Sequence, residues 1–163
     1  MTNRALAYKN SAADSSHSSG AFARYRTYAE VESLVRAFEA CTLPRADWTH
    51  QAHLTVALWY LAHCSGREAT ARIRNGIKRY NAANGVQTTR SGGYHETITL
   101  FWICVVSKYL LLADAGCSLV ELVNGLIARY SDGRFPFEYY SRELLMSWRA
   151  RTSWVEPDLK PLG

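Results

Sequence analysis

The segment from residue 93 to 112, GYHETITLFWICVVSKYLLL, constrains the fold of this chain more than any other. Between residues 98 and 106 it is apolar almost all the way round a helix, and such a helix is stable in water only when it is buried on every side. Ser107 and Lys108 interrupt the apolar run, so it falls short of the roughly 18 apolar residues of a membrane-spanning helix. We therefore predict that residues 93–113 form the buried central helix of a helical bundle, without a membrane span.

Capping signals and apolar periodicity indicate further helices on both sides of this segment. Thr27 with Glu30 and Ser118 with Glu121 match the capping box, and Thr49 is a typical N-cap residue. No stretch of the sequence shows the sustained alternation of a strand. We therefore predict an all-α fold of five to six helices, in which the central helix is joined by helices over residues 28–41, 50–64, 67–83, 119–130 and 142–152.

The length and composition are those of one domain preceded by a polar tail. A chain of 163 residues, of which 48% are hydrophobic, can bury a substantial core. Residues 1–22 are rich in Ser, Ala, Asn and Gly and lack periodicity, so we expect a disordered tail before a single domain at residues 23–163. The four cysteines form no CxxC motif and no apolar secretion signal is present, which favours the cytoplasm.

Most of the net positive charge lies near the start of the chain. The formal net charge is +5, and residues 1–26, with four basic residues and one acidic residue, contribute +3 of it. The rest of the chain is nearly neutral, whereas nucleic-acid-binding domains usually carry a concentrated basic face, which argues against a nucleic-acid partner. The basic cluster of residues 67–79 nevertheless leaves a nucleic-acid or protein interaction module open as one alternative, although such clusters are usually solvated helix faces.

Two short motifs place titratable side chains in the first turns of two predicted helices: His50 and His53 in HQAH, and His95 and Glu96 in YHET. The spacing of HQAH brings both imidazoles onto one helix face, close enough to share a metal ion. His95 would supply a third nitrogen, and three protein ligands with an open fourth position are typical of a catalytic zinc site. Two histidines with Glu96 would instead suit non-haem iron. We therefore predict a divalent metal, Zn or Fe with Ni, Cu and Mn as further options, at His50, His53 and His95.

The function that this pattern favours is a small metal-dependent enzyme, of hydrolase, lyase or non-haem oxygenase type, that acts on a small organic molecule. Its catalytic residues would be Tyr94, His95 and Glu96, with Glu96 as a base or as a hydrogen-bond partner of a metal ligand. The side chains predicted to bind the substrate are aromatic or polar, namely Trp48, Tyr80, Asn81, Tyr140 and Arg142.

Other interpretations of the same residues remain open. A metal-free small-molecule-binding protein or acid–base enzyme could use His95 and Glu96 as a hydrogen-bonded pair. Glu96 could also serve only as a capping residue, because it stands at the third helical position if Gly93 is the N-cap. The polar loop at residues 86–93 is a candidate lid, and the aromatic C-terminal segment could cover a second copy of the chain in a homodimer.

The segments WTHQAHL at residues 48–54 and GYHET at residues 93–97 resemble segments of small bacterial helical proteins. The similarity covers residues 43–100 and the PDL tripeptide near the end of the chain. Those proteins have no assigned activity, so the resemblance implies a helical fold and adds nothing about substrate or cofactor.

Overall fold

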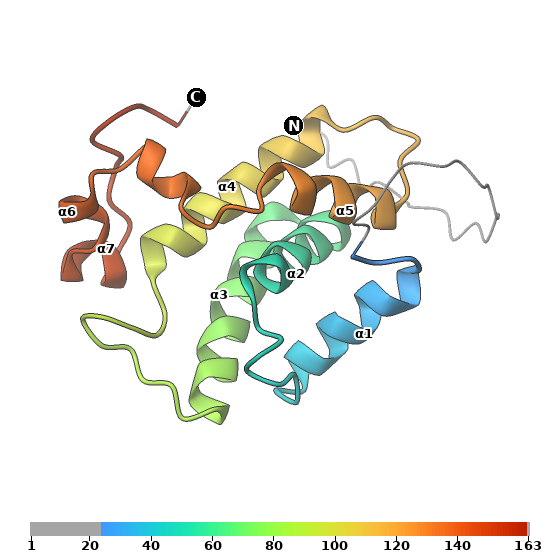
Figure 1. The fold of residues 1–163 in the computed structure, drawn as a ribbon, viewed down its shortest axis with the longest axis horizontal. Helices are drawn as coiled ribbons and strands as arrows, with labels where there is room; N and C mark the ends of the chain where they lie inside the picture. Colours follow the sequence, from blue (N-terminus) through green and yellow to red (C-terminus); the bar gives the residue numbers. More distant parts are fainter. Residues whose placement is uncertain (1–23, 163) are drawn as a thin grey trace.

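The computed structural model describes residues 24–162, and this part of the chain contains helices and loops but no strand (Figure 1). The all-α prediction is confirmed, whereas the tail predicted for residues 1–22 lies outside the described residues. In chain order the helices are α1 (Tyr28–Glu39), α2 (His50–His63), α3 (Gly66–Ala83), α4 (Glu96–Leu112), α5 (Leu119–Arg129), the 3₁₀ helix η1 (Phe135–Glu138), α6 (Arg142–Leu145) and α7 (Trp148–Thr152).

Helices α1, α2 and α5 begin at the N-cap residues that the sequence predicted. The hydroxyl of Thr27 accepts a hydrogen bond from the backbone N–H of Glu30, and the Glu30 carboxylate accepts one from the N–H of Thr27. Ser118 and Glu121 repeat this arrangement at α5, and the Thr49 side chain caps α2. These side chains bond N–H groups that the first turn of a helix leaves without a partner.

Helix α2 lies at the centre of the bundle. It packs against α1, α3, α4 and α5, and it contains no Asp, Glu, Lys or Arg. Helix α4 is also buried along most of its length, but its last turn is open to solvent, where Leu111 and Leu112 are each 83% exposed. The sequences explain this difference. A helix without charged side chains, such as α2, can be covered on every side without the free-energy cost of burying a charge. No helix of the described chain is long and apolar enough to cross a bilayer.

The helix predicted over residues 142–152 is instead two short helices, α6 and α7. The Ser147 hydroxyl accepts a hydrogen bond of 3.1 Å from the N–H of Ala150 and so caps a new helix. A serine hydroxyl can bond a nearby backbone N–H in this way, and such a bond competes with the hydrogen bonds of a continued helix. The resulting turn at Met146 and Ser147 places α7 against α4, beside the end at which α4 begins (Figure 1).

Helix α4 begins later than expected, at Glu96, with His95 as its N-cap. Gly93 has a φ of 81°, and a Cβ atom added there would clash with the backbone of residues 87–88. Gly93 therefore closes the loop at residues 86–93, and only glycine tolerates this close approach. Glu96 stands at the first helical position, so the interpretation of Glu96 as a capping-box residue is wrong.

Candidate functional site

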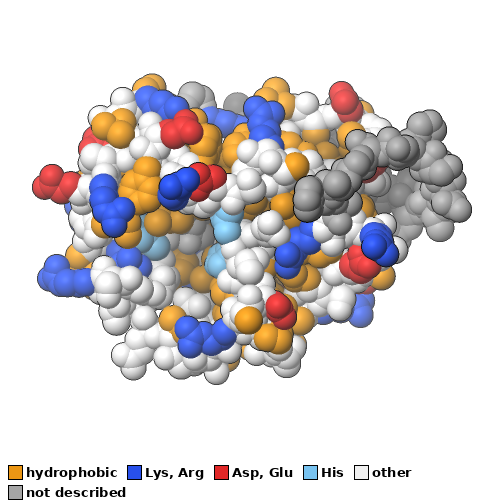
Figure 2. All heavy atoms as spheres, viewed as in Figure 1, with side chains coloured by type: hydrophobic (Ala, Val, Ile, Leu, Met, Phe, Trp, Pro, Cys, Tyr) orange, Lys and Arg blue, Asp and Glu red, His pale blue; other side chains and the backbone are white. Residues whose placement is uncertain are grey.

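A cavity of about 610 Å³ lies between the first turns of α2 and α4, the C-terminal half of α3 and the loop at residues 86–93. Figure 2 shows a hollow on this face, with histidine surface beside it and hydrophobic side chains within it. Met146 and Arg151 from the C-terminal segment also contribute to its wall. The predicted site residues that line the cavity are Trp48, His50, His53, Tyr80, Asn81, Tyr94 and His95.

His53 offers one free ring nitrogen to this cavity. Its Nδ1 lies 2.7 Å from the carbonyl oxygen of Thr49, and because a carbonyl only accepts, Nδ1 carries the proton and Nε2 carries the lone pair. The ring packs on Trp48 with 3.9 Å between the ring centroids. Burial, together with a smaller effect of the nearby His50, lowers the pKa of His53 to about 4, so His53 is neutral at pH 7.

The ring of His50 also donates one hydrogen bond to a backbone carbonyl, but through Nε2 instead of Nδ1. Its Nε2–H donates to the carbonyl oxygen of Tyr130 at 2.9 Å, which leaves the lone pair on Nδ1. The ring packs on Trp102 with 4.6 Å between the centroids, and burial lowers the pKa of His50. The HQAH motif therefore presents two neutral imidazoles, each fixed in one tautomer by a backbone carbonyl.

His95 has a different role from the one predicted. Its Nδ1 accepts a hydrogen bond of 3.3 Å from the N–H of Ile98, and its Nε2–H donates to the carbonyl oxygen of Leu145 at 2.8 Å. Both ring nitrogens are thus bonded to backbone, which leaves no lone pair for a metal in this arrangement. Among residues 24–162, no three His, Cys, Asp or Glu side chains are grouped so that they could hold a metal ion. The structure therefore does not assemble the predicted three-histidine site.

Glu96 belongs to a buried ion pair and does not line the cavity. Its two carboxylate oxygens accept hydrogen bonds from the guanidinium of Arg74, and the hydroxyl of Tyr94 donates to Oε2 at 2.7 Å. Burial and, after it, the hydrogen bond to Glu96 raise the pKa of Tyr94 to about 12. This cluster joins α3 to α4, and it leaves neither Tyr94 nor Glu96 free to exchange protons with a molecule in the cavity.

The residues predicted to bind a substrate fall into two groups. Trp48 and Tyr80 present aromatic surface to the cavity, and the side chain of Asn81 makes no hydrogen bond with any described residue. Tyr140 is fully buried and donates to the carbonyl oxygen of Val155, so it belongs to the core. Arg142 is exposed and does not line the cavity. The expected position of Tyr140 and Arg142 in the site is therefore wrong.

Arg151 lines the cavity, although no motif or periodicity in the sequence pointed to it. It is only 4% exposed, and its Nη1 donates to the carbonyl oxygens of Gly92 and Tyr94. In the sequence it is one of several arginines in a segment predicted to be an ordinary helix, and only the break at Ser147 turns it towards α4. No local signal in the sequence could have identified it.

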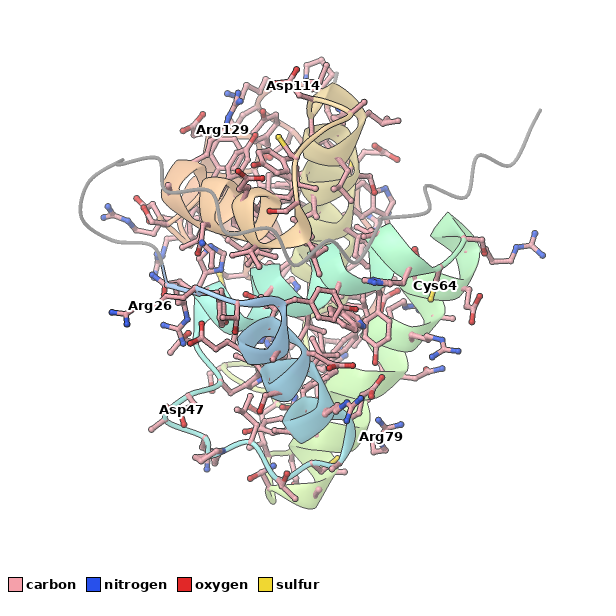
Figure 3. All side chains as sticks on the ribbon, turned by 90° about the vertical axis from the view of Figure 1, so that its right-hand side faces the viewer. Arg26, Asp47, Cys64, Arg79, Asp114 and Arg129 are labelled. Atoms are coloured by element: carbon pink, nitrogen blue, oxygen red, sulfur yellow. The ribbon has the colours of Figure 1, made fainter. Side chains whose placement is uncertain are left out.

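The basic side chains of α3 make contacts within the protein. Arg72 pairs with Glu68 on the same helix, and Arg74 belongs to the ion pair described above. Arg79 donates to the carbonyl oxygen of Glu39 at 3.0 Å, and Figure 3 shows Arg79 beside the end of α1. These contacts account for much of the basic cluster, and an interaction module on α3 stays a prediction.

Comparison of the chain with protein-family models, with curated proteins and with solved structures found no match. The proposed function therefore rests on the geometry of the cavity alone.

Proposed function

We propose that this protein binds a small organic molecule in the cavity between α2, α3 and α4, where His53 and His50 accept hydrogen bonds from the bound molecule or carry its proton. The observation that supports this proposal is the pair of neutral, tautomer-fixed imidazoles on the wall of a cavity of about 610 Å³. Cavities of roughly 300–1,000 Å³ with an apolar lining and a few polar groups are typical of small-molecule sites.

The rest of the wall suits a ligand with an apolar or aromatic body. Trp48 and Trp102 each pack on one of the two histidines, and Ile77 and Ile103 add aliphatic surface. Such side chains bind apolar groups by removing them from water, while the few polar groups set the orientation of the ligand.

Acid–base chemistry in this cavity would depend on the charge of the ligand. A neutral histidine with a pKa of about 4 is a weak base at pH 7. A ligand that brings negative charge next to His53 would raise this pKa towards neutrality, the range in which proton transfer is efficient. The proposed proton carrier is therefore His53, in place of the His95–Glu96 pair that the sequence suggested.

A metal-dependent enzyme is the second candidate, and one observation favours it. Histidines that bind metals usually donate their other ring N–H to a carbonyl or carboxylate, as His50 and His53 do. His50 Nδ1 and His53 Nε2 would hold the ion, and the ion, Zn or Fe, would polarise the bound molecule or activate water. His95 would take no part as a ligand in this arrangement.

The test compares His53→Gln with His63→Gln in a screen of small organic molecules by ligand-observed NMR. His63 is a matched control, because its Nδ1 also bonds a carbonyl four residues earlier and its ring also packs on a tryptophan, but it is exposed and outside the cavity. We expect molecules that bind the parent protein to bind His63→Gln equally and His53→Gln more weakly, by about fivefold or more for one lost hydrogen bond.

Equal binding to all three proteins would contradict the proposed role of His53 in ligand binding. Elemental analysis of the same preparations addresses the second candidate. Metal that is present in the parent protein and in His63→Gln, but absent from His53→Gln, would support metal binding by the HQAH motif. Metal retained in His53→Gln would contradict it.

A further inference from the structure

Arg151 is a buried cation without an acidic partner among the described residues. Only 4% of its surface is exposed, and none of the ion pairs between described residues includes it. Its Nη1 donates to two backbone carbonyls, of Gly92 at 3.2 Å and of Tyr94 at 3.4 Å. Its Nε is buried and has no hydrogen-bond partner. A buried charge without a counter-ion is costly, and an orphaned polar atom of this kind calls for an explanation.

The cavity that Arg151 lines has positive but no negative side chains in its wall. Its charged lining residues are Arg45 and Arg151, and no Asp or Glu of the described chain lines it. The nearest acidic side chain on the adjoining first turn of α4 is Glu96, which Arg74 already neutralises. The two histidines that also line the cavity, His50 and His53, are neutral for the reasons given above. The cavity therefore favours a negatively charged occupant.

We infer that the ligand of this cavity is an organic carboxylate with an apolar or aromatic body, whose carboxylate is bound by the guanidinium of Arg151. The inference rests on the proposed function and names the class of its ligand. A carboxylate would supply the counter-ion that Arg151 lacks, through a charge-assisted hydrogen bond to Nη2, the guanidinium nitrogen that is neither bonded to the two carbonyls nor buried without a partner. The single negative charge matches one buried guanidinium, and the aromatic wall at Trp48 and Trp102 receives the apolar body.

The experiment uses three probes of similar shape: 3-phenylpropanoate, the neutral 3-phenylpropanamide, and phenyl phosphate. Their affinities are measured by calorimetry for the parent protein and for Arg151→Gln. We expect the parent protein to bind the propanoate about tenfold or more tightly than the amide, as for one charge-assisted interaction. In Arg151→Gln we expect the propanoate to lose about tenfold, while the amide changes less than about twofold.

Two further variants serve as controls. Arg149→Gln removes an exposed arginine from the same short helix, and it should bind all probes like the parent protein. Ile98→Trp fills the cavity from α4, and it should lose the propanoate and the amide together. If Arg151→Gln does not fold, Arg151→Lys replaces it. We then expect weaker propanoate binding with unchanged amide binding, because an ammonium group keeps the charge without the planar fork of a guanidinium.

The outcomes separate the inference from the proposed function. Equal affinity of the parent protein for the propanoate and the amide, or a preference that persists in Arg151→Gln, would overturn the inference and leave the cavity as the binding site. Tighter binding of phenyl phosphate than of the propanoate would overturn the carboxylate class. Binding of no probe to the parent protein, or unchanged binding to Ile98→Trp, would overturn the proposed function and the inference with it.

Discussion

Three histidines line the cavity, and the hydrogen bonds of their rings divide them into two kinds. His50 and His53 each use one nitrogen to donate to a backbone carbonyl, which leaves one lone pair free. His95 uses both nitrogens, one as an acceptor at the start of α4 and one as a donor to Leu145. Of the three rings, those of His50 and His53 therefore keep a lone pair for a ligand, while His95 joins α4 to α6.

At the residue scale, the lowered pKa of His53 predicts a loss of stability in weak acid. The folded protein holds His53 neutral down to about pH 4, whereas an unfolded histidine binds a proton near pH 6.5. Between these values the unfolded state binds more protons, so the free energy of unfolding falls as the pH falls. The difference in pKa corresponds to at most about 3 kcal/mol for His53.

The measurement is urea unfolding at several pH values between 4 and 7, in buffer with a chelator, for the parent protein and His53→Gln. We expect the pH dependence of stability in this range to be clearly smaller in the variant, since glutamine does not titrate. Curves of equal slope would show that His53 has the same pKa in the folded and the unfolded protein, against the expected lowering.

At the element scale, the close contact of α1 with α3 depends on a residue without a side chain. A Cβ atom at Gly76 on α3 would lie 2.8 Å from the ring carbons Cε1 and Cζ of Phe38 on α1. Phe38 is fully buried and packs on Trp48, with 4.6 Å between the ring centroids. Gly76 thus sets the position of Phe38, on which the cavity residue Trp48 packs.

The substitution Gly76→Ala is therefore expected to destabilise the protein, although alanine favours a helix by about 1 kcal/mol. Overpacking of a filled core costs about 1–3 kcal/mol, which outweighs that gain. The control is Gly66→Ala in the same helix, where an added Cβ meets no atom within 4 Å. Urea unfolding should find Gly76→Ala less stable than Gly66→Ala by about 1–2 kcal/mol. Equal stability would mean that the Phe38 ring shifts without cost.

At the scale of the whole molecule, the C-terminal segment returns to the start of α4 and completes the cavity wall that carries Arg151. The fully buried hydroxyl of Thr97 donates to the carbonyl oxygen of Ser153 at 2.9 Å and accepts from the N–H of Val155 at 3.2 Å. Tyr140 donates to the carbonyl oxygen of Val155 at 3.1 Å. One threonine therefore holds together parts of the chain that are far apart in sequence.

Replacement of this hydroxyl in Thr97→Val should lower the free energy of unfolding by about 1–3 kcal/mol, because two buried backbone groups lose a partner. Thr99→Val is the matched control, since the Thr99 hydroxyl donates to the carbonyl oxygen of His95, one turn earlier, and makes no bond to the C-terminal segment among the described residues. Denaturant unfolding of both variants is the measurement. A loss in Thr99→Val as large as that in Thr97→Val would argue against a special role for the C-terminal segment.

The sequence by itself determined the helices and most of their starts, because a cap such as Thr27 or Ser118 and the apolar period act within a few residues. It also selected the HQAH and YHET motifs that meet at the cavity. Only the tertiary structure shows which histidine ring nitrogens stay free, since the hydrogen-bond partner of His95 Nε2 lies 50 residues away at Leu145. Arg151 likewise reached the cavity through a chain turn and long-range packing, and interactions of this range leave no periodic pattern in a sequence.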